Sequence, residues 1–197
     1  MSPSPRLRPR PTRPRTPRSP GYTLIEMLVV IAIVGILAAM AVPMFDSFIA
    51  RTQVNDQIST LASSLRQARS EALKRNIQVT LCPSDDADSE APTCAAAADG
   101  DIGWAAGWIA YAGAVVPTGD ADADRIVLRQ PAFASSGGIM PAQAGYTITY
   151  FPNGTALGGA GSFTFRPKGG EADPDTHRRM CISAQGSSRL TDDANCN

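Results

Sequence analysis

The sequence contains very little histidine, few aromatic residues and no excess of either charge. Its 197 residues include one histidine, His177, and 6% aromatic residues, and 18 Lys+Arg balance 18 Asp+Glu. A single histidine and the absence of a G-x-S-x-G motif leave no set of nucleophile and general base, so we expect no enzymatic activity and no cofactor. The charge balance excludes a generally basic nucleic-acid-binding protein, but it is compatible with a local basic patch.

The four cysteines do not have the spacing of a metal site. No two of them are spaced as C-x-x-C, so we expect no zinc site. All four lie in the second part of the chain, and in an oxidising compartment an even number of cysteines favours disulfides. Three connectivities are open, and we favour the sequential one because each bond then closes a short loop. These bonds would join Cys82 to Cys94 and Cys181 to Cys196.

The overall charge balance conceals a segregation along the chain. The first 20 residues contain six arginines and seven prolines and no acidic residue, and they cannot build a core. Without residues 1–21, the remaining 176 residues carry 12 basic and 18 acidic side chains, a net charge of −6. That length is sufficient for one ordinary domain with a helical extension.

One long apolar segment follows the arginine-rich region. Residues 27–45 are 19 residues without a charge, and as a helix they would span ~29 Å, close to the ~30 Å thickness of bilayer hydrocarbon. We therefore expect a single transmembrane segment at about 24–45, with the N-terminus cytoplasmic because the arginines precede it. The alternative is an ordinary signal peptide cleaved after Ala39-Met40-Ala41, which would release a soluble domain beginning at Val42.

The pattern after the apolar segment predicts an amphipathic helix and then a β-rich domain. Apolar residues recur at steps of three and four through residues 46–75, which predicts one buried helix face. β-prone runs bounded by Gly, Pro, Asn or Asp follow, and they predict an antiparallel sheet packed on that face. The expected face comprises Val54, Ile58, Leu61, Leu65, Ala68 and Ala72. The expected strands are 77–82, 107–111, 125–129, 146–151, 162–166 and 178–183.

Three further features of the β-rich domain are interpreted from the sequence. Residues 84–101 are acidic, rich in alanine and without periodicity, so we expect a surface loop tied by a disulfide. Trp104 and Trp108 are interpreted as core aromatic residues rather than as a ligand platform. His177 lies among loop-forming residues and is interpreted as a solvated loop histidine.

Glu26 lies inside the start of the apolar segment. A charged side chain at the bilayer centre costs ~2.5–3.5 kcal/mol, and less near an end, so such an acid needs either a partner or a place at the headgroup interface. The residues around it, 21–27, read GYTLIEM and join a basic leader ending in Gly21 to an unbroken apolar run. This string resembles a type IV pilin-like prepilin.

The resemblance implies processing and assembly. A prepilin peptidase would cut between Gly21 and Tyr22, and Tyr22, which takes the place of the family's usual Phe, would be N-methylated. In the assembled filament, Glu26 would neutralise the N-terminal amine of a neighbouring subunit, which supplies the charge partner that burial requires. Pro43 matches a proline often found at this distance from the mature N-terminus in the family.

The β-rich domain resembles the GspH/FimT group of minor pilins and pseudopilins. The resemblance is carried by Arg69-Ser70-Glu71-Ala72, by Val79-Thr80-Leu81-Cys82-Pro83, by Trp104 with Gly107-Trp108-Ile109, by Phe151-Pro152-Asn153-Gly154 and by Cys181-Ile182-Ser183. The Cys82-Pro83 pattern is closer to FimT-like minor pilins of type IV pili than to type II secretion pseudopilins.

Some FimT-like proteins bind DNA through a C-terminal Gly-Arg-x-Arg element during natural transformation. The matching positions here read Gly186-Ser187-Ser188-Arg189, so only Arg189 is retained. Arg178 and Arg179 are further candidates for phosphate contacts, although residues 76–197 carry 7 basic and 14 acidic side chains. The competing interpretation makes these arginines solvated residues of an edge strand.

These observations together predict an α+β protein with a type IV pilin-like fold, in which a long N-terminal helix packs on a C-terminal antiparallel β-sheet head. We expect a leader at 1–21, a helix at 22–75 that is transmembrane at about 24–45 and amphipathic at 46–75, and a head at 76–197. The expected function is that of a minor pilin or pseudopilin. The alternatives are a DNA-binding minor pilin and a secreted soluble domain.

The resemblance also implies where the protein works and with which partners. The precursor would lie in the inner membrane with its head in the periplasm, and the mature protein would then enter a type IV pilus or a type II secretion pseudopilus. The implied partners are other pilins or pseudopilins, a prepilin peptidase and an inner-membrane assembly platform.

Overall fold

The computed structural model describes residues 21–95, 102–114, 116–117, 124–143, 147–157, 161–169, 177–191 and 196. Within helix α1 the side chains of residues 40–44, 46 and 47 are left out of this description. The expected leader lies outside the described residues except for Gly21, and so does the end of the expected acidic loop. Contacts divide the chain into two compact units, Met1–Val42 and Pro43–Asn197.

Helix α1 spans Leu24–Arg75, close to the helix expected at 22–75. At its N-terminus the Thr23 side-chain oxygen Oγ1 accepts a hydrogen bond of 3.3 Å from the backbone N–H of Glu26, so Thr23 caps the helix. At its C-terminus Asn76 has φ 55°, the left-handed conformation in which helices commonly end. Lys74 and Arg75 in the last turn suit the negative end of the helix dipole.

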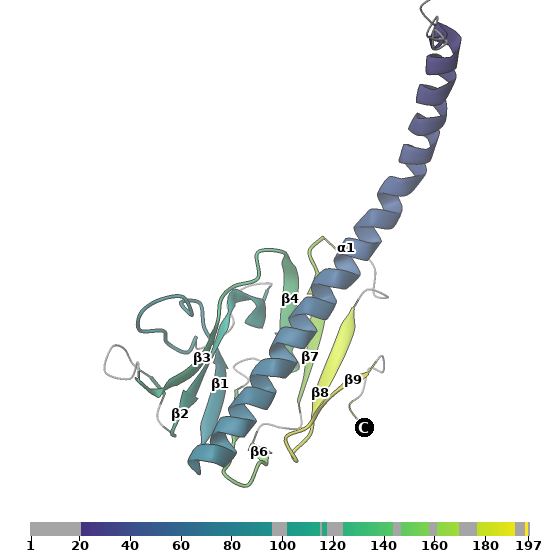
Figure 1. Ribbon diagram of the computed structural model, residues 1–197. Helices are drawn as coiled ribbons and strands as arrows, with labels where there is room; N and C mark the ends of the chain where they lie inside the picture. The colour runs from purple at the N-terminus through teal and green to yellow at the C-terminus, as the bar shows by residue number, and fades with distance from the viewer. Residues whose placement is uncertain are drawn as a thin grey trace, which may run out of the picture. The chain divides into compact units, whose positions relative to one another are not determined.

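The apolar face expected on the second half of α1 is confirmed. All six of its residues are buried, with exposed fractions between 0% for Leu61 and 7% for Ile58. These residues join the strand side chains in one core cluster, so the second half of α1 and the sheets belong to the same compact unit. Figure 1 shows this half of the helix lying across the strands.

The strands form two antiparallel sheets. The first sheet has the order β3-β2-β1-β5-β6 and the second has the order β4-β7-β8-β9. The first sheet contains β1 Val79–Pro83, β2 Trp108–Ala112, β3 Ile126–Gln130, β5 Ile148–Tyr150 and β6 Ala156–Leu157. The second contains β4 Ser136–Pro141, β7 Gly161–Pro167, β8 Arg178–Ile182 and β9 Ser188–Thr191.

The sequence correctly predicted an antiparallel β domain, but it did not predict two sheets or all of the strands. All six expected strands are present within a few residues of their expected bounds, whereas β4, β6 and β9 were missed. Strand β4 contains Gly137, Gly138 and Pro141, which are unfavourable residues in a strand, and β6 and β9 are too short to show an alternating pattern. Their pairing with longer neighbours decides their conformation.

Two contacts between loops and strands join the sheets around the core. The backbone N–H of Ile139 in β4 donates to the carbonyl of Ile102, next to the 3₁₀-helix η1 Trp104–Ala106, at 2.9 Å. The backbone N–H of Ala156 in β6 donates to the carbonyl of Ala184 in the β8–β9 turn, also at 2.9 Å. Each of these hydrogen bonds therefore ties a strand of one sheet to a segment that adjoins a strand of the other sheet.

Trp104 and Trp108 lie in the core between these elements, as interpreted from the sequence. Both side chains are fully buried. The ring of Trp104 packs edge-on against the ring of Phe163 of the second sheet, with 4.9 Å between the ring centroids. The ring centroids of Trp108 and Phe133 are 5.7 Å apart. These contacts give the tryptophans a structural role and leave them no accessible surface for a ligand.

Candidate functional site

The residues expected at the processing site lie at the exposed start of α1. Tyr22 is 80% exposed, and a Cβ atom built on Gly21 meets no atom within 4 Å. Thr23 and Glu26 together form the sequence pattern of a helix capping box, which marks the start of the helix. The helix therefore begins two residues after the expected new N-terminus at Tyr22.

The first part of α1 has no polar face. Between Leu24 and Leu37 every large apolar side chain is exposed, with exposed fractions from 49% to 82%. A helix that is apolar all round is stable when lipid or other helices surround it. This surface is the candidate assembly site. The first turn of α1 contains one acidic residue, Glu26.

A membrane span is not identified in this region. Within the part of the chain that the structure describes, no helix is both long and apolar enough to cross a bilayer. The transmembrane segment expected at about 24–45 is therefore not supported by this finding, and it includes residues 40–44, whose side chains lie outside the description.

The three arginines proposed for DNA contact do not share one face. In β8, Met180 and Ile182 point into the core, so Arg178 lies on the core side at the exposed end of the strand and Arg179 on the outer side. In β9, Arg189 pairs with Cys181, which places it on the outer side with Arg179. The structure thus brings Arg179 and Arg189 together and separates Arg178 from them.

A further arginine joins this outer face and was missed in the sequence. Phe163 and Phe165 of β7 are buried, so Arg166, one residue later, points outward. Thr164 pairs with Arg179, so Arg166, two residues along β7 from Thr164, is a diagonal cross-strand neighbour of Arg179. Arg189 is the corresponding diagonal neighbour of Arg179 in β9. We call Arg166, Arg179 and Arg189 the arginine diagonal.

His177 directly precedes β8 and is half-buried rather than fully solvated as expected. Its Nε2 atom is buried and has no hydrogen-bond partner within the described part of the chain.

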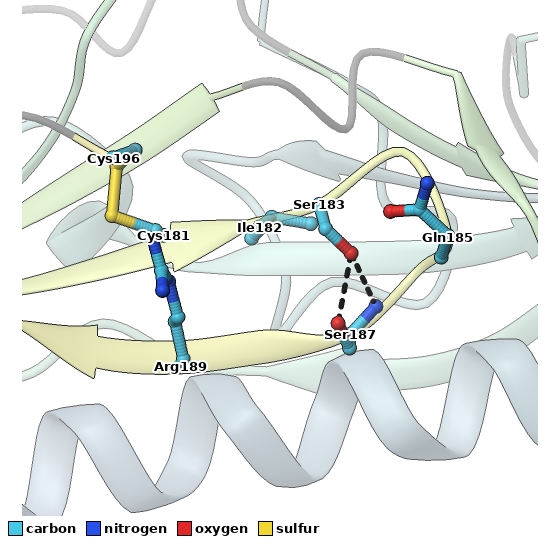
Figure 2. A pocket seen from close by; sticks show the side chains of 7 residues that line it. All are labelled: Cys181, Ile182, Ser183, Gln185, Ser187, Arg189 and Cys196. Atoms are coloured by element: carbon cyan, nitrogen blue, oxygen red, sulfur yellow. Dashed lines mark hydrogen bonds between the residues drawn. A yellow bond between two sulfur atoms is a disulfide. The ribbon is translucent and has the colours of Figure 1, made fainter.

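A pocket lies on the outer side of the β8–β9 hairpin. It has a volume of about 360 Å³. Figure 2 shows the Cys181–Cys196 disulfide on one side of it and the turn after β8 on the other. In that turn the hydroxyl oxygens of Ser183 and Ser187 lie 2.8 Å apart. The pocket residues are Cys181, Ile182, Ser183, Gln185, Ser187, Arg189 and Cys196.

The β8–β9 turn is held by an arginine of α1. Nη2 of Arg69 donates a hydrogen bond of 3.0 Å to the carbonyl of Gln185, and Nη1 donates to that of Gly186. The hairpin that carries Arg189 and the pocket is thereby fixed to the helix. The sequence pointed to Arg69 only as part of a resemblance.

The disulfides have the sequential connectivity that the sequence favoured. Cys82 is joined to Cys94 and Cys181 to Cys196, each with 5.6 Å between Cα atoms. The first bond holds the loop after β1 over the outer side of the first sheet, where Cys82, Ala87, Ile109 and Tyr111 form a second buried cluster. The expected surface loop therefore also covers apolar side chains.

Asp86 organises this loop. Its carboxylate accepts hydrogen bonds from the Ser84 hydroxyl at 2.8 Å, and from the Thr93 backbone N–H at 2.8 Å and hydroxyl at 3.0 Å. Partial burial raises the pKa of Asp86, but these hydrogen bonds outweigh it and hold the pKa below its ordinary value. Asp86 thus stabilises the loop from within, and its oxygens are already engaged.

Comparison with known proteins agrees with this geometry. A long helix packed on antiparallel sheets is the architecture of a type IV pilin-like protein. Residues 57–186 match the family described as type II transport protein GspH, and residues 17–42 match the prokaryotic N-terminal methylation motif. Because the first match spans more than half of the chain, the protein belongs to the GspH family of pilin-like proteins.

The fold is also that of a solved minor pilin. The crystal structure of the Pseudomonas aeruginosa PAO1 type IV minor pilin FimU matches with a TM-score of 0.50 and 18% identity, covering 73% of this chain and 92% of that one. A second crystal form of FimU gives a TM-score of 0.46 and 17% identity over 71% and 90% of the two chains. No curated protein matches significantly.

Proposed function

We propose that this protein is a minor pilin or pseudopilin that is cut by a prepilin peptidase between Gly21 and Tyr22, methylated at Tyr22, and assembled through its N-terminal helix. The observation that carries this proposal is the coincidence of the methylation motif at residues 17–42 with a helix surface that begins at Leu24 and is apolar except for Glu26. Such a surface first suits a membrane anchor and then the core of a filament.

Glu26 gives the assembly step its specificity. Among packed apolar helices an unpaired carboxylate is costly, and the positively charged amine of Tyr22 from a neighbouring subunit would relieve that cost. One such pair for each subunit would set the register between helices. The Thr23 cap supports this arrangement because it fixes the first helical turn, which carries Glu26.

The head would determine where the subunit sits in the filament, and the subunit would not form the filament shaft. Membership of the GspH family and the likeness to a minor pilin favour a subunit that primes or caps a type IV pilus or a type II secretion pseudopilus. Other pilins or pseudopilins and an inner-membrane assembly platform are the corresponding partners.

The test of processing is the intact mass and N-terminal sequence of the protein purified from membranes. We expect a chain that begins at Tyr22 and carries one added methyl group. A chain beginning at Val42 would instead show ordinary secretion of a soluble domain, and the proposal would be wrong.

A matched variant separates processing from folding. Gly21→Leu should block cleavage, and it should leave the fold unchanged because an added Cβ at this position meets nothing within 4 Å. The expected product is the full-length precursor in membranes. Cleavage of this variant at Tyr22 would show that the peptidase does not read Gly21.

DNA binding is a second candidate function, favoured by the arginine diagonal. Arg179 and Arg189 face outward together with Arg166, so a phosphate backbone could lie along this face. The acidic head opposes such binding, since residues 76–197 carry 7 basic against 14 acidic side chains. Any affinity would therefore be local to this face and strongly dependent on salt.

The test is the retardation of a DNA duplex by the purified protein over a range of salt concentrations. Arg179→Gln or Arg189→Gln should weaken binding and lower the slope of log affinity against log salt by about 0.9 for each DNA phosphate that the variant no longer neutralises. Arg178→Gln is the matched control, because Arg178 lies on the opposite face. No retardation at low salt, or equal effects of the three variants, would remove this function.

A further inference from the structure

The two disulfides differ in their access to solvent. Cys82 is fully buried, and Cys94 is half-buried against the cluster of Ala87, Ile109 and Tyr111. Cys181 is 2% exposed, but its partner Cys196 is exposed, and both line the pocket of about 360 Å³. A reagent can therefore approach the Cys181–Cys196 bond from the side of Cys196.

The first disulfide is also held in place by its surroundings. The backbone N–H of Ala95, next to Cys94, donates to the carbonyl of Pro83 at 2.8 Å. The carboxylate of Asp86 ties Thr93 into the same loop. A nucleophile would have to displace this loop before it could reach the Cys82–Cys94 sulfur atoms.

Arg189 places a positive charge beside the accessible disulfide. It is the cross-strand partner of Cys181, and Figure 2 shows its side chain extending from β9 toward Cys181. A guanidinium next to a cysteine favours the thiolate form of that cysteine. Arg189 would therefore stabilise the negative charge on the Cys181 sulfur as that sulfur leaves, and it would also attract an anionic attacking thiolate.

From this geometry we infer that the Cys181–Cys196 pocket is a site of thiol–disulfide exchange with a dithiol reductant or a dithiol oxidoreductase. A thiolate of the dithiol attacks Sγ of Cys196 and forms a mixed disulfide, while the Sγ–Sγ bond breaks and its electron pair leaves on Cys181 as a thiolate. The second thiolate of the dithiol then attacks the dithiol's own sulfur in the mixed disulfide, and Cys196 is released as a thiolate. The dithiol becomes a disulfide, and the two cysteines take up its two protons.

The exchange affects one sheet only. Reduction removes the covalent connection between Cys181 in β8 and Cys196, on the outer face of the second sheet that also carries the arginine diagonal. The first sheet keeps its own disulfide. The inference is independent of the assembly mechanism, because it depends only on the head.

The test is timed reduction of the full-length protein in detergent micelles with limiting dithiothreitol, followed by iodoacetamide labelling and peptide mass mapping. We expect Cys181 and Cys196 to be labelled at a rate roughly tenfold higher than Cys82 and Cys94. Equal rates, or faster labelling of the first pair, would falsify the inference. Emission from the buried Trp104 and Trp108 should stay constant during the reaction, which excludes global unfolding as its cause.

Variants at one position test the contribution of the guanidinium. Arg189→Gln should slow reduction of Cys181–Cys196 roughly three- to tenfold, and Arg189→Lys should retain most of the rate because it keeps the charge. Arg178→Gln removes the same charge from the opposite face and should react at the wild-type rate. A wild-type rate for Arg189→Gln would overturn the role of Arg189, and an unfolded variant would be recognised by faster labelling of both disulfides.

Discussion

The carbonyl of Gly186 accepts a hydrogen bond from Nη1 of Arg69 at 3.4 Å, across 117 residues of sequence. This contact joins the helix to the β8–β9 turn. Gly154, in the β5–β6 turn, lies close to both Arg69 and Gly186. A Cβ atom on Gly154 would lie 3.3 Å from the Arg69 guanidinium, and one on Gly186 would lie 2.5 Å from the Gly154 carbonyl oxygen. One arginine and two glycines thus connect α1 with both sheets.

This junction predicts that Gly186→Ala is strongly destabilising. Gly186 has φ +78°, where an L side chain costs about 1–2 kcal/mol, and the added methyl also collides with backbone. We expect a loss of about 2–4 kcal/mol in the free energy of unfolding, measured by urea denaturation in detergent. Gly169→Ala is the control, because Gly169 has φ +73° but no atom within 4 Å of its Cβ position. Equal losses for both variants would show that the collision contributes nothing.

The buried face of α1 predicts a contrast between two of its leucines. Leu61 is fully buried, so Leu61→Ala should lower the free energy of unfolding by about 2–5 kcal/mol through reduced burial and the cavity left behind. Leu73 is 50% exposed, and Leu73→Ala should cost less than about 1 kcal/mol. The same denaturation experiment measures both, and a similar cost for the two variants would contradict the packing of α1 on the sheets.

Asp86 predicts a loss of stability in acid. Its pKa is lower in the folded than in the unfolded state, so its contribution is fully present above the unfolded pKa of about 3.9 and is lost as the pH falls through the folded pKa. Asp86→Asn should therefore reduce stability at pH 7 and reduce the difference in stability between pH 7 and about pH 2. Asp88→Asn, a change at an exposed residue of the same loop, should leave that difference near the wild-type value. An unchanged pH dependence in Asp86→Asn would refute this role.

Glu26 predicts that assembly and processing can be separated. Glu26→Gln keeps the size of the side chain and its helical position but removes the charge that would pair with the amine of a neighbouring subunit. We expect a mature N-terminus at Tyr22 with normal methylation, together with loss of the protein from sheared filaments. Recovery of this variant in filaments at the wild-type level would show that register does not depend on the charge pair.

Local sequence patterns predicted most of the framework. The apolar face from Val54 to Ala72 was recognisable because a helix repeats every 3.6 residues, and strands such as β1 and β7 were recognisable from β-branched and aromatic residues. The boundaries of α1 follow from Thr23 and Asn76, which act on their immediate neighbours. These features could be predicted because each depends on residues close together in the chain.

The arrangement of the candidate DNA-binding face of the head could not be predicted in this way. The sequence grouped Arg178 with Arg179 because they are adjacent, whereas the strand places them on opposite sides and brings Arg166 and Arg189 to Arg179. The pocket likewise needs the β8–β9 turn and Cys196 to meet over the outer side of the hairpin. Strand register decides these neighbours, and register depends on partners far along the chain.

The sequence by itself therefore determined the helix, its start beside Gly21, its buried face and the family, because these rest on local periodicity, capping and a contiguous motif. Only the tertiary structure decided that the strands divide into two sheets, that Arg69 holds the turn at Gly186, and that Arg189 lies beside the accessible disulfide. The physical reason is that backbone pairing and side-chain packing between distant segments select among conformations that local preferences leave nearly equal in free energy.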